Sequence, residues 1–159
     1  MADLTKIFSG MESGPEAIQS NFEKMNQTVE NMGGQLSGLH WSELNDAGIV
    51  SSNDWQALGV NRGSGYRTAN LGGLKLVWLT LLVEHTNGNF KGSQCGYIIT
   101  LPENIHPAVY GLGGKLDDSQ TSWYYWDGNH QISFNATTSD YTWANGHIYP
   151  VVALYLANN

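Results

Sequence analysis

Apolar side chains recur at helical spacing between residues 15 and 32. They follow one another at intervals of 4, 3, 4 and 3 residues, with mostly polar side chains between them: Ile18, Phe22, Met25, Val29 and Met32. This is a two-heptad a/d stripe, which lies along one side of a helix. Gly14-Pro15-Glu16 suits a helix start, and Gly33-Gly34 suits a helix end. The pattern therefore predicts a helix over residues 15–32.

The apolar stripe of this segment needs a partner. An isolated helix of this length is only marginally stable in water. Two heptads are fewer than the three or four that identify a coiled coil. Because the segment is terminal and Gly33-Gly34 separates it from the rest, we expect it to self-associate through the stripe. The alternative is that the helix packs on its own domain.

From residue 36 onward, short apolar and aromatic runs alternate with turns rich in Gly, Asn and Pro. The run 74–83 is typical of a strand that is buried on both faces for much of its length. The last run, 148–156, is apolar on both faces, which favours a central strand or one at a subunit interface. Several such runs predict a mainly β fold, with an antiparallel β-sandwich or barrel after the short helix. We expect a helical segment over 1–34, a linker or neck over 35–54 and a β head over 55–159.

Composition excludes several classes of function. The 159 residues include 7 Lys+Arg against 14 Asp+Glu, a formal net charge of −7, with no basic stripe for nucleic acid. No apolar run is long enough to span a bilayer, so we expect no membrane insertion. A single cysteine, Cys95, excludes an internal disulfide, and no secretory signal is visible. These features favour folding in a reducing cytosol.

Candidate catalytic groups are sparse. Asp117-Asp118 is the only adjacent carboxylate pair, and it lies in a loop flanked by Gly and Ser, which predicts a solvated turn. A glycosidase needs two carboxylates placed across a sugar, and nothing in the sequence places two in this way. The five histidines are scattered without ligand spacing. We therefore expect a non-enzymatic protein without metal or cofactor.

The segment 123–135 is predicted to form a hairpin whose two faces differ. A turn at Asp127-Gly128 or Gly128-Asn129 gives the same partition of faces. The inner set would be Trp123, Tyr125, His130, Ile132 and Phe134. The outer set would be Tyr124, Trp126, Gln131, Ser133 and Asn135. Aromatic rings beside amides and a hydroxyl are typical of a saccharide platform, although burial against a second sheet or a subunit would also explain them.

The segment 141–156 is predicted to form a second hairpin with its turn at Asn145-Gly146. Trp143 and His147 lie close to that turn and are two further candidates. Loop residues on a rigid β frame are common binding residues, although a place in the core is the alternative for Trp143. The candidate saccharide contacts from both hairpins are Tyr124, Trp126, Asp127, Asn129, Gln131, Trp143 and His147.

The chain also resembles a known family. Residues 7–25 are similar to the start of baseplate receptor-binding proteins of siphophages that infect lactic acid bacteria, in the positions Gly10, Met11, Gly14, Glu16, Ile18 and Asn21. The rest is similar to the head domain of phage tail proteins of Gram-positive hosts. The similar pieces, in order, are Tyr66-Arg67, the run 74–83, the segment 96–103 with Pro107, an Asp-Gly or Asn-Gly hairpin, and the run 148–156.

The resemblance implies a homotrimer. Its N-terminal helices would form a trimeric bundle that docks on an upper baseplate protein, and its β head would bind host cell-wall polysaccharide. The implied location is the virion tail tip. The family's β-prism neck has only residues 33–54 to form it here, so we expect a short neck or none. The alternatives are a structural baseplate or tail assembly protein, a cellular lectin-like module and a glycan hydrolase.

Overall fold

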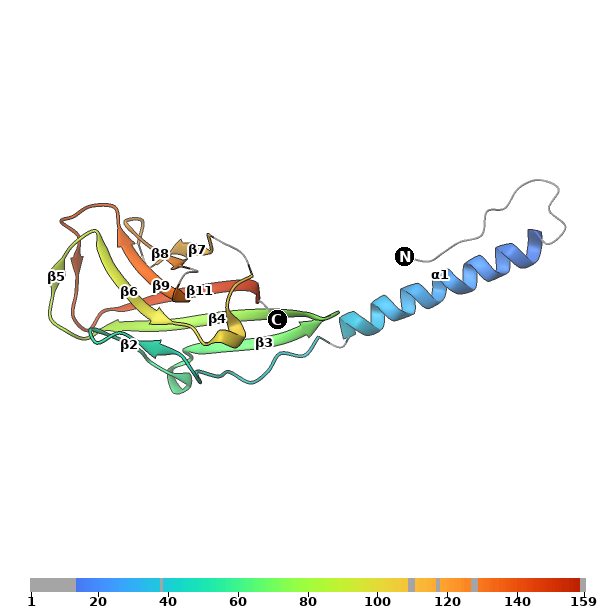
Figure 1. Ribbon diagram of the computed structural model, residues 1–159, viewed down its shortest axis with the longest axis horizontal. Coiled ribbons are helices and arrows are strands. Elements are labelled where there is room, and N and C mark those ends of the chain that lie inside the picture. Colours follow the sequence, from blue (N-terminus) through green and yellow to red (C-terminus); the bar gives the residue numbers. More distant parts are fainter. Residues whose placement is uncertain (1–13, 38, 109–110, 117, 127–128, 158–159) are drawn as a thin grey trace. The chain divides into compact units, whose positions relative to one another are not determined.

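The computed structural model describes residues 14–37, 39–108, 111–116, 118–126 and 129–157 (Figure 1). The chain divides into a helical unit, 1–39, and a β unit, 40–159. The fold is mainly β, with one N-terminal α-helix and antiparallel sheets, which confirms this part of the predicted class. The resemblance positions Gly10 and Met11 lie outside the described residues.

Helix α1 (Gly14–Ser37) begins where the sequence predicts but ends later. It continues through Gly33-Gly34, so the predicted end at these residues is wrong. Neither glycine adopts the positive φ of a helix stop, and glycine within a helix costs only about 1 kcal/mol relative to alanine. The described side chains of the apolar stripe are all exposed, namely Ile18, Phe22, Met25 and Val29. Met32 lies in the same helix.

The first sheet of the β unit is built on the long strand β4 (Leu74–His85). It pairs with β11 (Ile148–Ala157) on one side and with β3 (Gly65–Leu71) and β2 (Trp55–Ala57) on the other. Alternate residues of β4 from Val77 to Val83 are buried, but Trp78 on the opposite face is exposed. The prediction that the run 74–83 is buried on both faces is therefore wrong.

The second sheet has the strand order β1-β6-β9-β8-β7. Its strands are β1 (Val50–Ser51), β6 (Gln94–Thr100), β9 (Gln131–Ala136), β8 (Thr121–Trp126) and β7 (Gly113–Lys115). A small pair, β5 (Phe90–Lys91) with β10 (Thr142–Trp143), and two 3-10 turns, η1 (Val60–Arg62) and η2 (Glu103–Ile105), complete the described elements.

The two larger sheets share one hydrophobic core. Leu79 and Val151 come from the first sheet, and Ile132 and Phe134 from the second. An aromatic cluster around Trp55 adds rings from several strands, with centroids 5.3 to 5.9 Å from that of Trp55: Phe134, Trp143 and Tyr149. This packed interior gives a firm frame for the side chains on the outer faces.

The residues predicted as a linker or neck divide between the two units. Residues 35–37 continue α1, whereas the stretch from residue 40 belongs to the β unit. Ser42 N donates to Thr68 O at 2.8 Å, and Asn45 exchanges two backbone hydrogen bonds with Tyr66. These bonds fasten residues 42–45 along β3, so this polar stretch extends the sheet.

Candidate functional site

Strands β8 and β9 form the predicted hairpin, with one of the two registers that the prediction left open. Trp126 lies opposite Gln131, the pairing expected for a turn at Gly128-Asn129. Four members of the predicted inner set are buried, namely Trp123, Tyr125, Ile132 and Phe134. His130 is half-buried: its Nδ1 lies 3.1 Å from the Tyr125 hydroxyl, and its ring stacks on His106 with 3.5 Å between centroids. The core side of the hairpin thus follows the alternation in the sequence.

The opposite side of this sheet carries two rows of side chains that we call the outer aromatic face. Direct cross-strand partners share a face of a sheet. One row runs from Thr100 through Gln131 to Trp126, and the next from Tyr97 through Ser133 to Tyr124. The outer aromatic face is defined by these residues: Tyr97, Thr100, Tyr124, Trp126, Gln131 and Ser133.

Three residues of the outer aromatic face carry aromatic rings, namely Tyr97, Tyr124 and Trp126. Trp126 is 51% exposed, and Tyr97 is exposed to a similar extent. The Tyr124 ring meets the Trp126 ring edge to face, with centroids 6.1 Å apart. A half-exposed tryptophan held by a neighbouring ring presents a flat, ordered surface to an incoming ligand.

Two polar atoms at the centre of this face lack hydrogen-bond partners. Gln131 Nε2 donates to Thr100 Oγ1 at 3.2 Å, but Gln131 Oε1 is buried and accepts no hydrogen bond. Ser133 Oγ is also unpartnered, in a residue only 2% exposed. An unsatisfied buried polar group costs about 1–3 kcal/mol, and such a group in a native protein calls for an explanation. A ligand reaches either atom only when a neighbouring side chain moves.

The sequence missed part of this face. Tyr97 and Thr100 lie on β6, about thirty residues from the hairpin, and reach it only through the pairing of β6 with β9. That pairing shifts register between Tyr97 and Ile99, so Ile98 and Ile99 are both buried while Tyr97 is exposed. A β-bulge of this kind redirects side chains in a way that simple alternation does not predict.

The remaining candidates are spread over other places. Asn129 is exposed in the β8–β9 loop, and Asp127 lies outside the described residues. Trp143 is fully buried, and its Nε1 donates to Gly92 O at 2.9 Å, so its ring offers no surface for a sugar. This burial corrects the predicted ligand contact. His147 is exposed just before β11, away from the outer aromatic face, with its ring against Tyr149.

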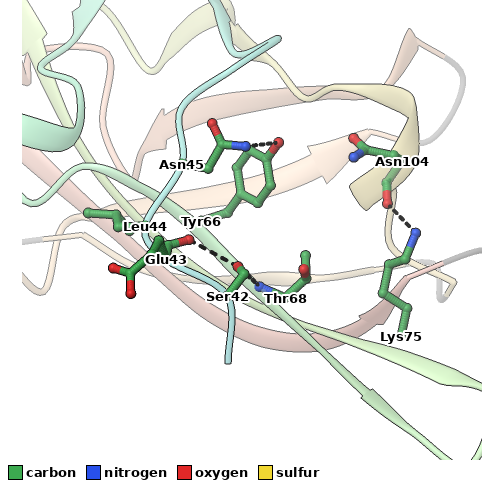
Figure 2. A pocket seen from close by; sticks show the side chains of 8 residues that line it. All are labelled: Ser42, Glu43, Leu44, Asn45, Tyr66, Thr68, Lys75 and Asn104. Atoms are coloured by element: carbon green, nitrogen blue, oxygen red, sulfur yellow. Dashed lines mark hydrogen bonds between the residues drawn. The ribbon is translucent and has the colours of Figure 1, made fainter. Parts of the chain in front are cut away.

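A pocket of about 420 Å³ lies elsewhere in the β unit (Figure 2). Its lining comes from residues 42–45, β3, β4 and η2: Ser42, Glu43, Leu44, Asn45, Tyr66, Thr68, Lys75 and Asn104. Many of its polar groups bond within the protein. Asn45 Nδ2 donates to the Tyr66 hydroxyl at 3.3 Å, and Lys75 Nζ donates to Asn104 O at 3.2 Å. These bonds fasten chain segments together, so the pocket is a weaker candidate than the outer aromatic face.

Asp118 acts as a turn-forming residue. Its Oδ1 accepts hydrogen bonds from Gln120 N at 2.7 Å and Thr121 Oγ1 at 2.9 Å, and its Oδ2 accepts one from Tyr141 at 3.0 Å. Desolvation opposes the charged form, but these hydrogen bonds outweigh it and lower the pKa of Asp118. Asp117 lies outside the described residues.

The described part of the chain shows neither a group of metal ligands nor a membrane-spanning helix. No group of three or more His, Cys, Asp or Glu side chains among the described residues is placed to hold a metal ion. None of the described helices combines the length and apolar character that crossing a membrane requires.

Compared with models of protein families, with curated proteins and with solved structures, the chain matches none of them.

Proposed function

We propose that this chain is a phage tail receptor-binding protein that attaches the virion to host cell-wall saccharides without cleaving them. The observation that carries the proposal is the half-exposed Trp126 ring beside Gln131, whose buried Oε1 has no hydrogen-bond partner. The proposal also includes a β-sandwich head, a trimeric bundle of α1 and a location at the baseplate. It rests on the outer aromatic face, the apolar stripe and the resemblance described above.

Binding would combine stacking with neutral hydrogen bonds. The apolar C–H face of a sugar ring would lie on Trp126, with Tyr124 and Tyr97 at its sides. After a neighbouring side chain moves, sugar hydroxyls would donate to Gln131 Oε1 and exchange hydrogen bonds with Ser133, and they would also reach the exposed Asn129. No charged side chain belongs to the two rows of the outer aromatic face. This composition suits an uncharged ligand.

Self-association would convert weak sites into firm attachment. The apolar stripe of α1 is exposed along its described length, as expected of a helix that packs on copies of itself. A homotrimer presents three saccharide sites, and many trimers on one baseplate raise the effective concentration further. The N-terminal helical segment, residues 1–34, would dock on an upper baseplate protein. The same exposed surfaces would also serve a purely structural tail assembly protein, which is the second candidate.

Binding of the full chain to wall polysaccharide tests the proposal. Polysaccharides purified from a panel of lactic acid bacteria would be immobilised and probed with the full chain. On those that bind, Trp126→Ala should weaken binding at least about tenfold at unchanged solution mass, since exposed tryptophans are frequent hot spots. Val60→Ala, which trims an exposed apolar side chain of η1, is the control and should bind normally.

Other results would favour other functions. Normal binding by a folded Trp126→Ala variant would refute this site. No binding to any wall polysaccharide, together with tight binding to a baseplate protein, would favour the structural candidate. Release of reducing ends from the polysaccharide would reveal a hydrolase.

A further inference from the structure

The first sheet also has an outer face, and this face is apolar. β11 and β4 pair so that Val152 lies opposite Thr80, Leu154 opposite Trp78, and Leu156 opposite Leu76. Leu154 is 65% exposed and Trp78 is 45% exposed. We call this the outer apolar face and define it by these residues: Leu74, Leu76, Trp78, Thr80, Val152, Leu154 and Leu156. It accounts for the final strand being apolar on both sides.

We infer that the outer apolar face is a contact between copies of this chain within the β unit. The inference does not depend on saccharide binding. It extends to the β unit the self-association that the proposed function assigns to α1.

The size of the exposed surface supports a second copy as the occupant. Taking roughly 150–200 Å² for a large apolar side chain, the exposed fractions of the five most exposed members leave about 400–500 Å² of apolar surface. The described stripe of α1 leaves about 300–400 Å² by the same measure. A standard interface buries about 800 Å² per partner. The two surfaces together reach this size, and neither reaches it alone.

Charge also favours a second copy. The chain carries a formal net charge of −7, so copies repel one another unless they meet where carboxylates are absent. No acidic residue belongs to the rows that form the outer apolar face. The adjoining residue of β3 is a cation, Arg67, which pairs with Trp78 across the strands. Its Nη1 donates to Ser42 O at 3.1 Å.

The shape of this face offers a place for a side chain of the second copy. A hollow of about 220 Å³ lies beside Trp78, lined also by Leu44, Gly63, Arg67 and Thr80. On the same face, Leu154 is one of the most exposed large apolar side chains. A protruding leucine and a neighbouring hollow on one surface suit packing between identical chains.

Solution mass of the full chain over a range of concentrations tests the inference. The sheet variant Val152→Thr/Leu154→Thr places a β-branched residue, which suits a strand, at both positions and removes apolar surface. The helix variant Phe22→Gln/Val29→Gln removes part of the stripe of α1. Val50→Thr, an exposed strand residue of the other sheet, is the matched control for the sheet variant.

We expect an oligomer for the wild-type chain and the control. The sheet variant should dissociate at a concentration at least about tenfold higher than the wild-type chain, and so should the helix variant, because neither surface reaches the standard interface size alone. A chain with both sets of substitutions should be monomeric. Circular dichroism would check folding, and Trp78→Gln is the substitute should the sheet variant fail to fold.

Two outcomes would overturn the inference. These are a monomeric wild-type chain and a sheet variant that dissociates like the control. A monomeric wild-type chain would also point to α1 covering this face within one chain. Loss of saccharide binding by Trp126→Ala at unchanged mass bears only on the other face, so the two proposals fail separately.

Discussion

The two sheets of the β unit have similar inner faces and contrasting outer faces. Their inner residues merge in one core, but the outer aromatic face mixes rings with amides and hydroxyls, whereas the outer apolar face is largely aliphatic around Trp78. The outer aromatic face holds two buried polar atoms without partners, Gln131 Oε1 and Ser133 Oγ. Unsatisfied polar atoms favour a hydrogen-bonding ligand, and an exposed apolar surface favours another protein. One domain can thus display two recognition surfaces of different chemistry.

Trp143 belongs to neither outer face, so its replacement gives the loss of stability expected for a core tryptophan. It is fully buried among Phe90, Tyr141 and Tyr149. Trp143→Ala should lower the free energy of unfolding by about 3–5 kcal/mol, since it leaves a large cavity. Trp126→Ala, which removes a half-exposed ring, should change it by less than about 1 kcal/mol. Urea denaturation of both variants measures the difference, and equal losses would contradict the distinction between core and surface.

Replacement of Ser133 tests whether an unpartnered polar atom of the outer aromatic face is kept for a ligand. Ser133→Ala removes an unsatisfied buried hydroxyl, so it should raise the free energy of unfolding by about 1 kcal/mol. The same change should weaken saccharide binding severalfold. Greater stability with weaker binding is expected of a group kept for a ligand. A variant that loses stability, or one that binds normally, would show that Ser133 has only a packing role.

Asp118 belongs to neither outer face, and its replacement should have the smallest effect of these substitutions on stability. The pKa of its carboxyl is lowered in the folded protein, so its contribution to stability is present above its unfolded pKa and is lost as pH falls through the folded pKa. Asp118→Asn should therefore be less stable than wild type at neutral pH, with a difference that shrinks in acid. Thermal melts from pH 7 to pH 3 would check this. Saccharide binding and solution mass should stay unchanged.

Local alternation predicted part of the site and not the rest. The inner and outer faces of β8 and β9, including the inner position of Ile132, follow from alternation around a short turn, but alternation left two registers open. Tyr97 was not predicted as part of the site, because its strand is far from the hairpin in the sequence and pairs with β9 in an irregular register. Trp143 was misassigned because the rings that enclose it come from other strands of the fold.

The helix shows the same limit. Its start and its apolar stripe follow from residue spacing, but Gly33-Gly34 did not end it. Glycine permits a helix stop without imposing one. The contrast between the outer faces was likewise invisible in the sequence, because both faces draw on aromatic and aliphatic runs that look alike before the strands are paired.

The most direct test of the central claim compares the two exposed tryptophans, Trp126 and Trp78. Each would be replaced by alanine in the full chain, and saccharide affinity would be measured with a short oligosaccharide from a wall polysaccharide that binds, so that avidity does not contribute. Trp126→Ala should lose affinity at least about tenfold and keep its mass, since exposed tryptophans are frequent hot spots. Trp78→Ala should keep the affinity and dissociate more readily. Normal oligosaccharide affinity in a folded Trp126→Ala variant would contradict the account.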